Sequence, residues 1–186
     1  MRSLLASLLI LLPCVGCSAQ SASQLDGNWW LLQREDQRTA FHAGYYICYV
    51  WDVGFLDLPE NFEPVRSVTD FYLRTEHSRD MPVTEVFTKI DADGPRRRRP
   101  LADEKYGESN GDYWRSATRA ERIEYVRGYL ACQKLHFKVD IDKPIETYVD
   151  ELSAWYGTND SDPGQVNLKT ADDKIPVVLT QLLRKK

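Results

Sequence analysis

The stretch Arg38-Thr-Ala-Phe-His-Ala-Gly-Tyr-Tyr-Ile-Cys48 occurs a second time 84 positions later, as Arg122-Ile-Glu-Tyr-Val-Arg-Gly-Tyr-Leu-Ala-Cys132. In each copy an arginine, an aromatic residue, a glycine, a tyrosine and a cysteine stand at identical spacing. Trp30 and Trp114 precede the two arginines by the same distance. The last four of these residue types fall at i, i+3, i+4 and i+7, which share one face of a helix. The sequence therefore predicts a duplicated helical unit.

The correspondence continues on both sides of this stretch. Residues 27–72 align without a gap with residues 111–156. The identical pairs are Gly27/Gly111, Trp30/Trp114, Arg38/Arg122, Gly44/Gly128, Tyr45/Tyr129, Cys48/Cys132 and Tyr72/Tyr156. Farther on, Met81-Pro-Val83 matches Ile175-Pro-Val177 if the second copy is lengthened before that point. We therefore place a first helical repeat at residues 27–90, a linker at 91–110 and a second helical repeat at 111–186.

These patterns predict an all-α fold of two tandem helical repeats, with about three helices each, packed around a pseudo-two-fold axis. We expect the first helix of the two copies over residues 34–52 and 119–137, the second from Pro64 and Pro144, and the third from Pro82 and Pro176. Proline is tolerated in a first turn, where N–H groups have no intrahelical partner. Thr118 and Glu121 form a capping-box pattern, and Gly157 is the expected stop of the helix before it.

A glycine inside a helix costs roughly 1 kcal/mol relative to alanine, so the equivalent Gly44 and Gly128 need a physical reason. We favour close packing of the two repeats, with Tyr45 and Tyr129 beside the contact. Backbone contact with a ligand is the alternative.

Cys48 and Cys132 lie one turn beyond these glycines on the same helix faces. If equivalent faces meet, the two thiols come together, and we predict a Cys48–Cys132 disulfide. The bond would stabilise the fold by nominally about 4 kcal/mol through its effect on the unfolded chain. Two buried free thiols are the alternative.

Residues 1–19 are predicted to be an export signal, because the apolar run at residues 4–12 is too short to span a bilayer. We favour a lipoprotein signal in which Cys17 becomes lipidated, although Cys14 stands where such signals usually have leucine. Cleavage after Ala19 and an uncleaved anchor are the alternatives. Residues 20–26 would form a flexible tether.

The serine that directly follows Cys17 favours the outer membrane of a two-membrane bacterium. We therefore expect an exported protein in the periplasm, held at the outer membrane through a lipid anchor only. Either processing route leaves Cys48 and Cys132 as a pair in an oxidising compartment.

The chain of 186 residues has 42% hydrophobic residues and a net charge of −4, which is typical of a globular protein and argues against a nucleic-acid partner. The run Arg96-Arg-Arg-Arg99 is interpreted as part of a solvated linker, with contact to anionic lipid or an acidic partner as the alternative. The three histidines are His42, His77 and His136. Neither the histidines nor any other residues have the spacing of a metal-binding, cofactor-binding or catalytic motif.

Arg38 and Arg122 are the charges that recur in both copies. Their favoured role is hydrogen bonding at a buried edge, or stacking on Trp30 and Trp114. A binding site formed by these four residues is the alternative.

The order aromatic-x-x-Gly-Tyr, a proline-led helix ending in an aromatic–tyrosine pair, and a short terminal helix resembles the Rap/Tai-type immunity family of type VI secretion. The resemblance covers each half, chiefly residues 41–48 with 65–90 and residues 125–132 with 145–183. It implies small exported helical proteins that bind and neutralise a rival's effector in the periplasm, often as dimers, so that a tandem copy would be a fused dimer. Members are usually single-copy with a cysteine where this chain has Leu58-Pro59.

The sequence therefore predicts a protein that binds an unidentified protein partner, of immunity or inhibitor type, through surface aromatic residues and the loop at residues 158–174. The alternative is a structural or accessory envelope lipoprotein without catalytic activity. The third possibility is an enzyme whose reaction cannot be recognised from the sequence.

Overall fold

The computed structural model describes residues 25–53, 56–59, 63–92, 96–99, 109–158, 170 and 172–184. The signal segment with Cys17, nearly all of the tether and most of the loop at residues 158–174 lie outside these residues. The described chain is predominantly helical, which confirms the predicted class. It is not purely helical, because it also contains a two-stranded sheet.

The described residues of each half contain four α-helices rather than about three. The first half has α1 (Gly27–Leu32), α2 (Glu35–Val53), α3 (Pro64–Arg74) and α4 (Val83–Ala92), with a short 3₁₀ helix, η2 (Glu76–Ser78), between the last two. The second half has α5 (Gly111–Ser116), α6 (Arg119–His136), α7 (Ile145–Trp155) and α8 (Ile175–Arg184). The helices α2 and α6 match the expected residues 34–52 and 119–137 closely, whereas the six-residue helices α1 and α5 are too short to show a helical period.

Local hydrogen bonds explain where these helices begin and end. The Asp26 carboxylate accepts from the Trp29 N–H at 2.9 Å and caps α1, and the Asn110 side chain caps α5 in the same way. The capping box of Thr118 and Glu121 is present at the start of α6. Gly157, just past the end of α7, has a φ of 66°, a left-handed conformation that glycine adopts without strain.

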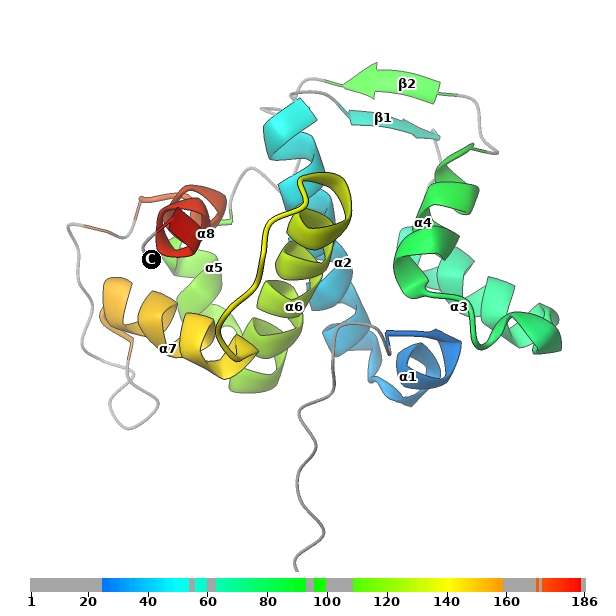
Figure 1. Cartoon of the computed structure of the whole chain (residues 1–186), viewed down its shortest axis with the longest axis horizontal. Coiled ribbons are helices and arrows are strands. Elements are labelled where there is room, and N and C mark those ends of the chain that lie inside the picture. Colours follow the sequence, from blue (N-terminus) through cyan, green and yellow to red (C-terminus); the bar gives the residue numbers. More distant parts are fainter. Residues whose placement is uncertain are drawn as a thin grey trace, which may run out of the picture.

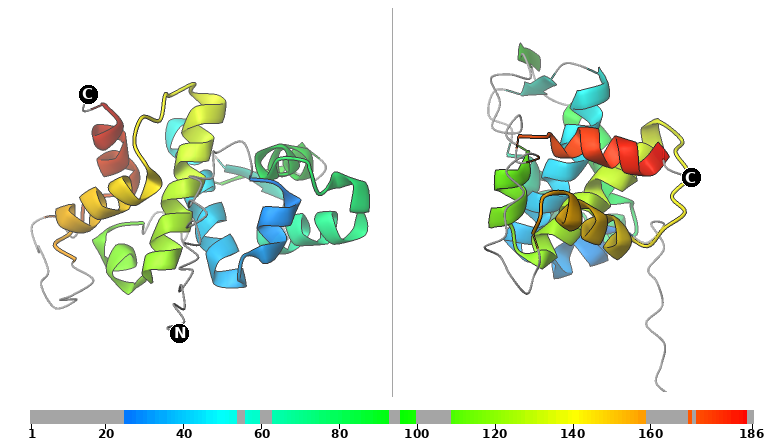
Figure 2. Two further views of the ribbon diagram at one scale, coloured as in Figure 1. Left: turned by 60° about the horizontal axis from the view of Figure 1, so that its bottom comes forward. Right: turned by 90° about the vertical axis from the view of Figure 1, so that its left-hand side faces the viewer.

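The long helices α2 and α6 lie side by side in the middle of the molecule (Figure 1). The helices α1, α3 and α4 flank them on one side, and α5, α7 and α8 on the other, as Figure 1 and the left view of Figure 2 show. One hydrophobic core runs through both halves. Its largest fully buried side chains are Trp30, Trp114, Tyr72, Tyr125, Tyr129, Tyr148, Tyr156, Phe41, Ile47, Leu152 and Ile175.

The arginine run, which was interpreted as part of a solvated linker, contains a strand that the sequence did not predict. It forms β2 (Arg96–Arg99), which pairs antiparallel with β1 (Leu56–Pro59). Main-chain hydrogen bonds hold such a pair together, so four arginines in a row can form a strand without the apolar alternation by which strands are recognised. The ribbon lies at the same end of the molecule as the C-terminal end of α2 (Figure 1).

The third helix of each half begins at a different place from the one expected. Pro82 precedes α4, and α8 begins at Ile175, one residue before Pro176. The Val83 N–H donates to the Leu25 carbonyl at 2.8 Å, and the Ile175 N–H donates to the Ser109 carbonyl at 2.9 Å. Because Leu25 and Ser109 precede α1 and α5 equivalently, these bonds match Val83 with Ile175. The sequence alignment had paired Val83 with Val177 and was two residues out of register.

Candidate functional site: the contact between α2 and α6

The two interior glycines lie where α2 and α6 approach each other most closely. A Cβ atom added at Gly44 would lie 2.7 Å from the carbonyl carbon of Tyr125, and one added at Gly128 would lie 2.9 Å from that of Phe41. Both distances are well inside ordinary van der Waals contact. Each glycine therefore meets the backbone of the other helix at the aromatic residue three positions before the partner glycine. No side chain larger than hydrogen fits between the helices here.

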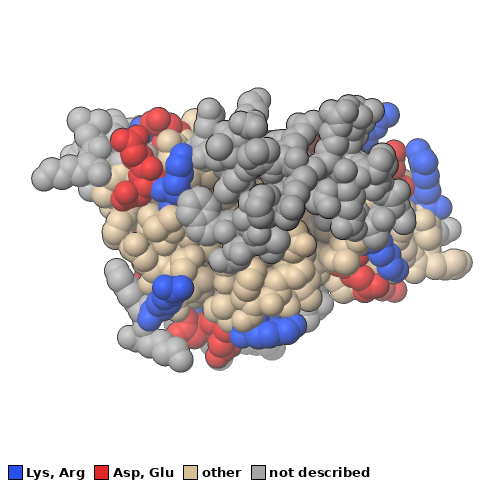
Figure 3. Space-filling model, turned by 90° about the horizontal axis from the view of Figure 1, so that it is seen from above, with Lys and Arg blue, Asp and Glu red and all other residues tan. Residues whose placement is uncertain are grey.

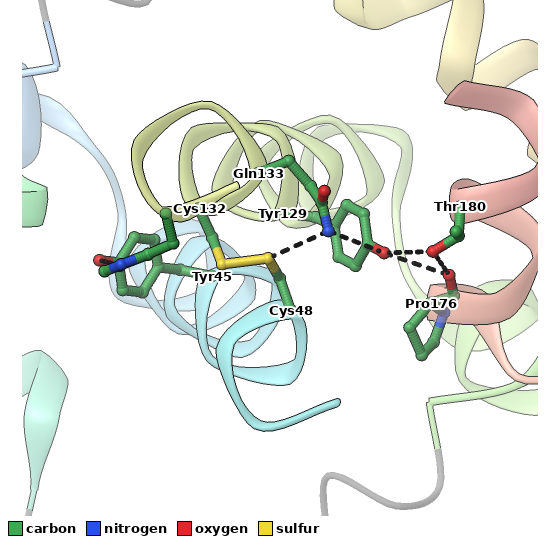
Figure 4. The surroundings of a disulfide bond; sticks show 8 residues. Tyr45, Cys48, Tyr129, Cys132, Gln133, Pro176 and Thr180 are labelled. Atoms are coloured by element: carbon green, nitrogen blue, oxygen red, sulfur yellow. Dashed lines mark hydrogen bonds between the residues drawn. A yellow bond between two sulfur atoms is a disulfide. The ribbon is translucent and has the colours of Figure 1, made fainter. Parts of the chain in front are cut away.

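The disulfide links the same two helices one turn farther along. The Cys48 and Cys132 sulfur atoms are bonded, with 6.2 Å between the two Cα atoms, and neither residue is exposed. The predicted disulfide is thus confirmed, and the alternative of free thiols is wrong. The Gln133 amide donates to the Cys48 sulfur at 3.5 Å and so covers one side of the bond (Figure 4).

The two tyrosines beside the contact have different partners. The Tyr45 hydroxyl is hydrogen-bonded to Nε2 of His136 at 2.9 Å, which ties α2 to the last turn of α6. The Tyr129 hydroxyl is hydrogen-bonded to the Thr180 hydroxyl at 2.9 Å and donates to the Pro176 carbonyl at 3.2 Å, which ties α6 to α8. The rings extend from the disulfide in opposite directions (Figure 4). Equivalent residues therefore serve different contacts in the two halves.

The repeated arginines close the C-terminal ends of the short helices. The Arg38 Nε donates to the Trp30 carbonyl at 3.0 Å, and the Arg122 Nε donates to the Trp114 carbonyl at 2.8 Å. The Arg122 guanidinium also lies over the Trp114 ring, 5.6 Å from its centroid. Carbonyls at the end of a helix have no intrahelical donor, and a guanidinium supplies one. Both arginines therefore have a structural role, because they donate to carbonyls at the ends of α1 and α5.

Both tryptophans are fully buried. Nε1 of Trp30 donates to the Thr69 hydroxyl at 3.0 Å, and Nε1 of Trp114 donates to the Ser153 hydroxyl at 3.2 Å. Each indole thus links a short helix to the helix that follows the long one. Because neither ring has exposed surface, the structure places Trp30 and Trp114 in the core rather than where a partner could touch them.

A buried carboxyl group and a partly buried arginine near the contact were not predicted from the sequence. Burial raises the pKa of the Glu124 carboxyl to about 7, and the nearby Arg127 partly opposes that shift. Glu124 Oε2 and Arg127 Nε are 3.3 Å apart, and the Arg127 guanidinium lies 5.8 Å from the Trp29 ring centroid. The first half has Ala40 and alanine at position 43 in the corresponding places. This difference between the two halves could have indicated, from the sequence alone, that α6 carries a charged pair on the side that faces α1.

His42 is buried among rings. Its imidazole stacks on Tyr46 with the centroids 5.2 Å apart and meets Phe87 edge-on at 5.3 Å. Burial lowers the pKa of His42 to about 3, so the ring is neutral at physiological pH. The residue behaves as part of the core.

Three further observations concern the part of the chain that the structure describes. Within it, no three His, Cys, Asp or Glu side chains are close enough together to hold a metal ion. No helix there is both long and apolar enough to cross a membrane. Seen from above, described basic and acidic side chains lie near one another around the rim, with uncharged residues between them (Figure 3).

Comparisons of the chain with family models, with curated proteins and with solved structures each found no match. The fold and the contact define a predominantly helical protein whose long central helices are joined by a buried disulfide. The resemblance to the Rap/Tai-type immunity family rests on the sequence pattern alone.

Proposed function

We propose that this chain is an exported envelope protein, anchored by a lipid on Cys17, that acts by binding another protein. The observation that carries the proposal is the fully buried Cys48–Cys132 disulfide. Disulfides of this kind persist in oxidising compartments such as the periplasm and are rare in the cytosol. The bond therefore agrees with the export signal inferred from residues 1–19.

The halves are proposed to be tandem repeats related by a pseudo-two-fold axis through the α2–α6 contact. Such an axis makes contacts reciprocal, as in a homodimer. The Gly44–Tyr125 and Gly128–Phe41 approaches are reciprocal in this sense. The tryptophan–hydroxyl bonds of the two halves also recur at corresponding positions. The disulfide would then join two copies of one residue, one on each side of the axis.

The proposed partner is a protein that this chain neutralises, which is what the resemblance to the Rap/Tai-type immunity family implies. A tandem arrangement would fix within one chain the pairing that single-copy members reach by dimerisation. The rigid, disulfide-linked helix pair suits this task, because a preorganised surface loses little conformational freedom on binding.

A pull-down with chemical crosslinking, using the mature protein in envelope extract, tests the binding proposal. We expect one specific protein to be recovered and an adjacent gene to encode a toxin-like product. Recovery of no specific partner would reject the proposal. A deletion that weakens the envelope in the absence of any toxin would favour the accessory role instead.

Cell fractionation tests the anchor separately. The wild-type protein and a Cys14→Ser control should pellet with membranes, whereas Cys17→Ser should not. Equal distribution of all three would reject lipidation at Cys17.

A further inference from the structure

Exposed apolar side chains cluster at the end of the molecule where α2 and α6 finish. Tyr49 is 37% exposed, Leu135 is 38% exposed and Phe137 is 39% exposed. The ring of His136, also exposed, joins them, with its centroid 5.2 Å from that of Tyr49 and 6.3 Å from that of Phe137. Single exposed apolar residues are ordinary, but a contiguous group is typical of an interaction surface. We name these four residues the aromatic end.

The aromatic end is held rigidly. Tyr49 directly follows the disulfide-bonded Cys48, and Leu135 lies one turn after Cys132. The His136 ring is fixed by its hydrogen bond to the Tyr45 hydroxyl at 2.9 Å. Rigid aromatic side chains lose little freedom when they are covered, which is why they dominate the energetics of many interfaces.

Two lysines flank the aromatic end. Lys134 and Lys138 are both exposed. The whole chain has a net charge of −4, whereas these two exposed side chains are both positive. An acidic surface would complement this end.

Lys138 has a conformation that requires explanation. Its φ of 57° lies in the left-handed region. Within the described residues, Lys138 is the one non-glycine residue whose φ is positive. Residues other than glycine pay roughly 1 kcal/mol or more for that conformation. The corresponding position of the first half, 84 residues earlier, is glycine. The Lys138 ammonium donates to the Leu135 carbonyl at 2.7 Å, which holds its charge beside the aromatic end.

We propose that the aromatic end, with Lys134 and Lys138, is the surface that docks the protein partner, and that the partner presents acidic residues around an apolar centre. This inference rests on the proposed binding function. A membrane is the less suitable occupant, since the tether joins at Leu25, beside α1, which lies at the opposite end of α2 (Figure 1). A second copy of the chain would bring like charges together.

Photocrosslinking in intact cells tests the assignment with the full-length chain. A p-benzoylphenylalanine residue replaces Phe137 in one variant and Leu73, which is 60% exposed on α3, in the matched control. We expect a heterologous protein adduct from position 137 and none from position 73, with the crosslinked peptide of the partner rich in Asp and Glu. The substitutions Lys134→Glu and Lys138→Glu together should lower the adduct yield about tenfold, whereas Arg66→Glu on α3 should not.

Each other outcome overturns the assignment in a distinguishable way. A specific protein adduct from position 73 alone would leave the binding function standing and move the docking surface to α3. An adduct of twice the chain's mass would identify a second copy. Pelleting of the purified protein with phosphatidylglycerol vesicles but not with phosphatidylcholine vesicles, without a protein adduct, would identify the membrane. Unchanged melting of the lysine variants shows that a lower yield does not come from unfolding.

Discussion

Replacing Gly44 by alanine tests whether the close approach of α2 and α6 determines the stability of the fold. The added methyl group would lie 2.7 Å from the Tyr125 carbonyl carbon and 3.1 Å from its Cα atom, where ordinary contacts lie between 3.4 and 4 Å. The obstacle is the backbone of a central helix, so no side chain can rotate out of the way. The helices must move apart by about 1 Å, a gap that forfeits a quarter to a half of the dispersion energy between facing atoms.

The expected free-energy change has two opposing parts. Overpacking a core costs about 1–3 kcal/mol, and occasionally more. The better helix propensity of alanine offsets about 1 kcal/mol of that cost. Because the clash is with backbone, the cost lies at the upper end of that range, about 3 kcal/mol, so we expect a net loss of about 2 kcal/mol and a Tm lower by about 4–8 °C for a domain of this size.

Thermal unfolding followed by circular dichroism, with the disulfide intact, measures this change. Gly128→Ala should give a similar loss because its contact with the Phe41 backbone is reciprocal. The double variant should lose less than the two single losses combined, since helices that have already separated accommodate a second methyl group more easily. Thr39→Ala, on the exposed side of α2, is the control and should be near neutral. An unchanged or higher Tm for Gly44→Ala would refute the reasoning.

Three further predictions concern the disulfide and the buried titratable groups. The double variant Cys48→Ala/Cys132→Ala should lose about 4 kcal/mol in urea unfolding, and dithiothreitol should destabilise the wild type but not this variant. The pKa of Glu124 is raised by burial from 4.5 to about 7. Its contribution to the stability of the fold is therefore present below pH 4.5 and is lost as pH rises through 7. The wild type should lose about 3 kcal/mol of stability between pH 5 and pH 8, and Glu124→Gln should not show this loss. The pKa of His42 is lowered from 6.5 to about 3, so its contribution to stability is present above pH 6.5 and is lost on acidification. His42→Gln should abolish a loss of about 2 kcal/mol between pH 6.5 and pH 4.5 in the same assay. Unchanged slopes in the variants would contradict these assignments.

The helix pattern of this protein could be predicted where residues repeat at helical spacing. The aromatic, glycine, tyrosine and cysteine positions of α2 and α6 share one face, and that face is the one by which the two helices meet. From this arrangement the disulfide followed, because equivalent cysteines on facing helices come within bonding distance. The helical class and the bond were therefore accessible without coordinates. The duplication itself stays a prediction, supported by the reciprocal contacts.

Other features were not visible in the pattern for physical reasons. The helices α1 and α5 span six residues each and depend on caps from Asp26 and Asn110 rather than on periodicity. The strand β2 is held by main-chain pairing with β1, and a run of arginines has no apolar alternation from which a strand could be predicted. The register of α8 is set by the bond between Ile175 and Ser109, which are distant in the sequence. The aromatic end was missed because its residues belong to two helices and become neighbours only through folding.

The bond between Cys48 and Cys132 also changes what a cut in the chain would do. All residues between 48 and 132 belong to a covalent ring that includes α3, α4, α5 and the connection between the halves. A protease that cuts once within this ring leaves two fragments that remain one molecule until a reductant is added. A single nick in the connection between the halves would neither release a fragment nor separate α2 from α6. The cut chain would migrate as two bands on a denaturing gel only after reduction.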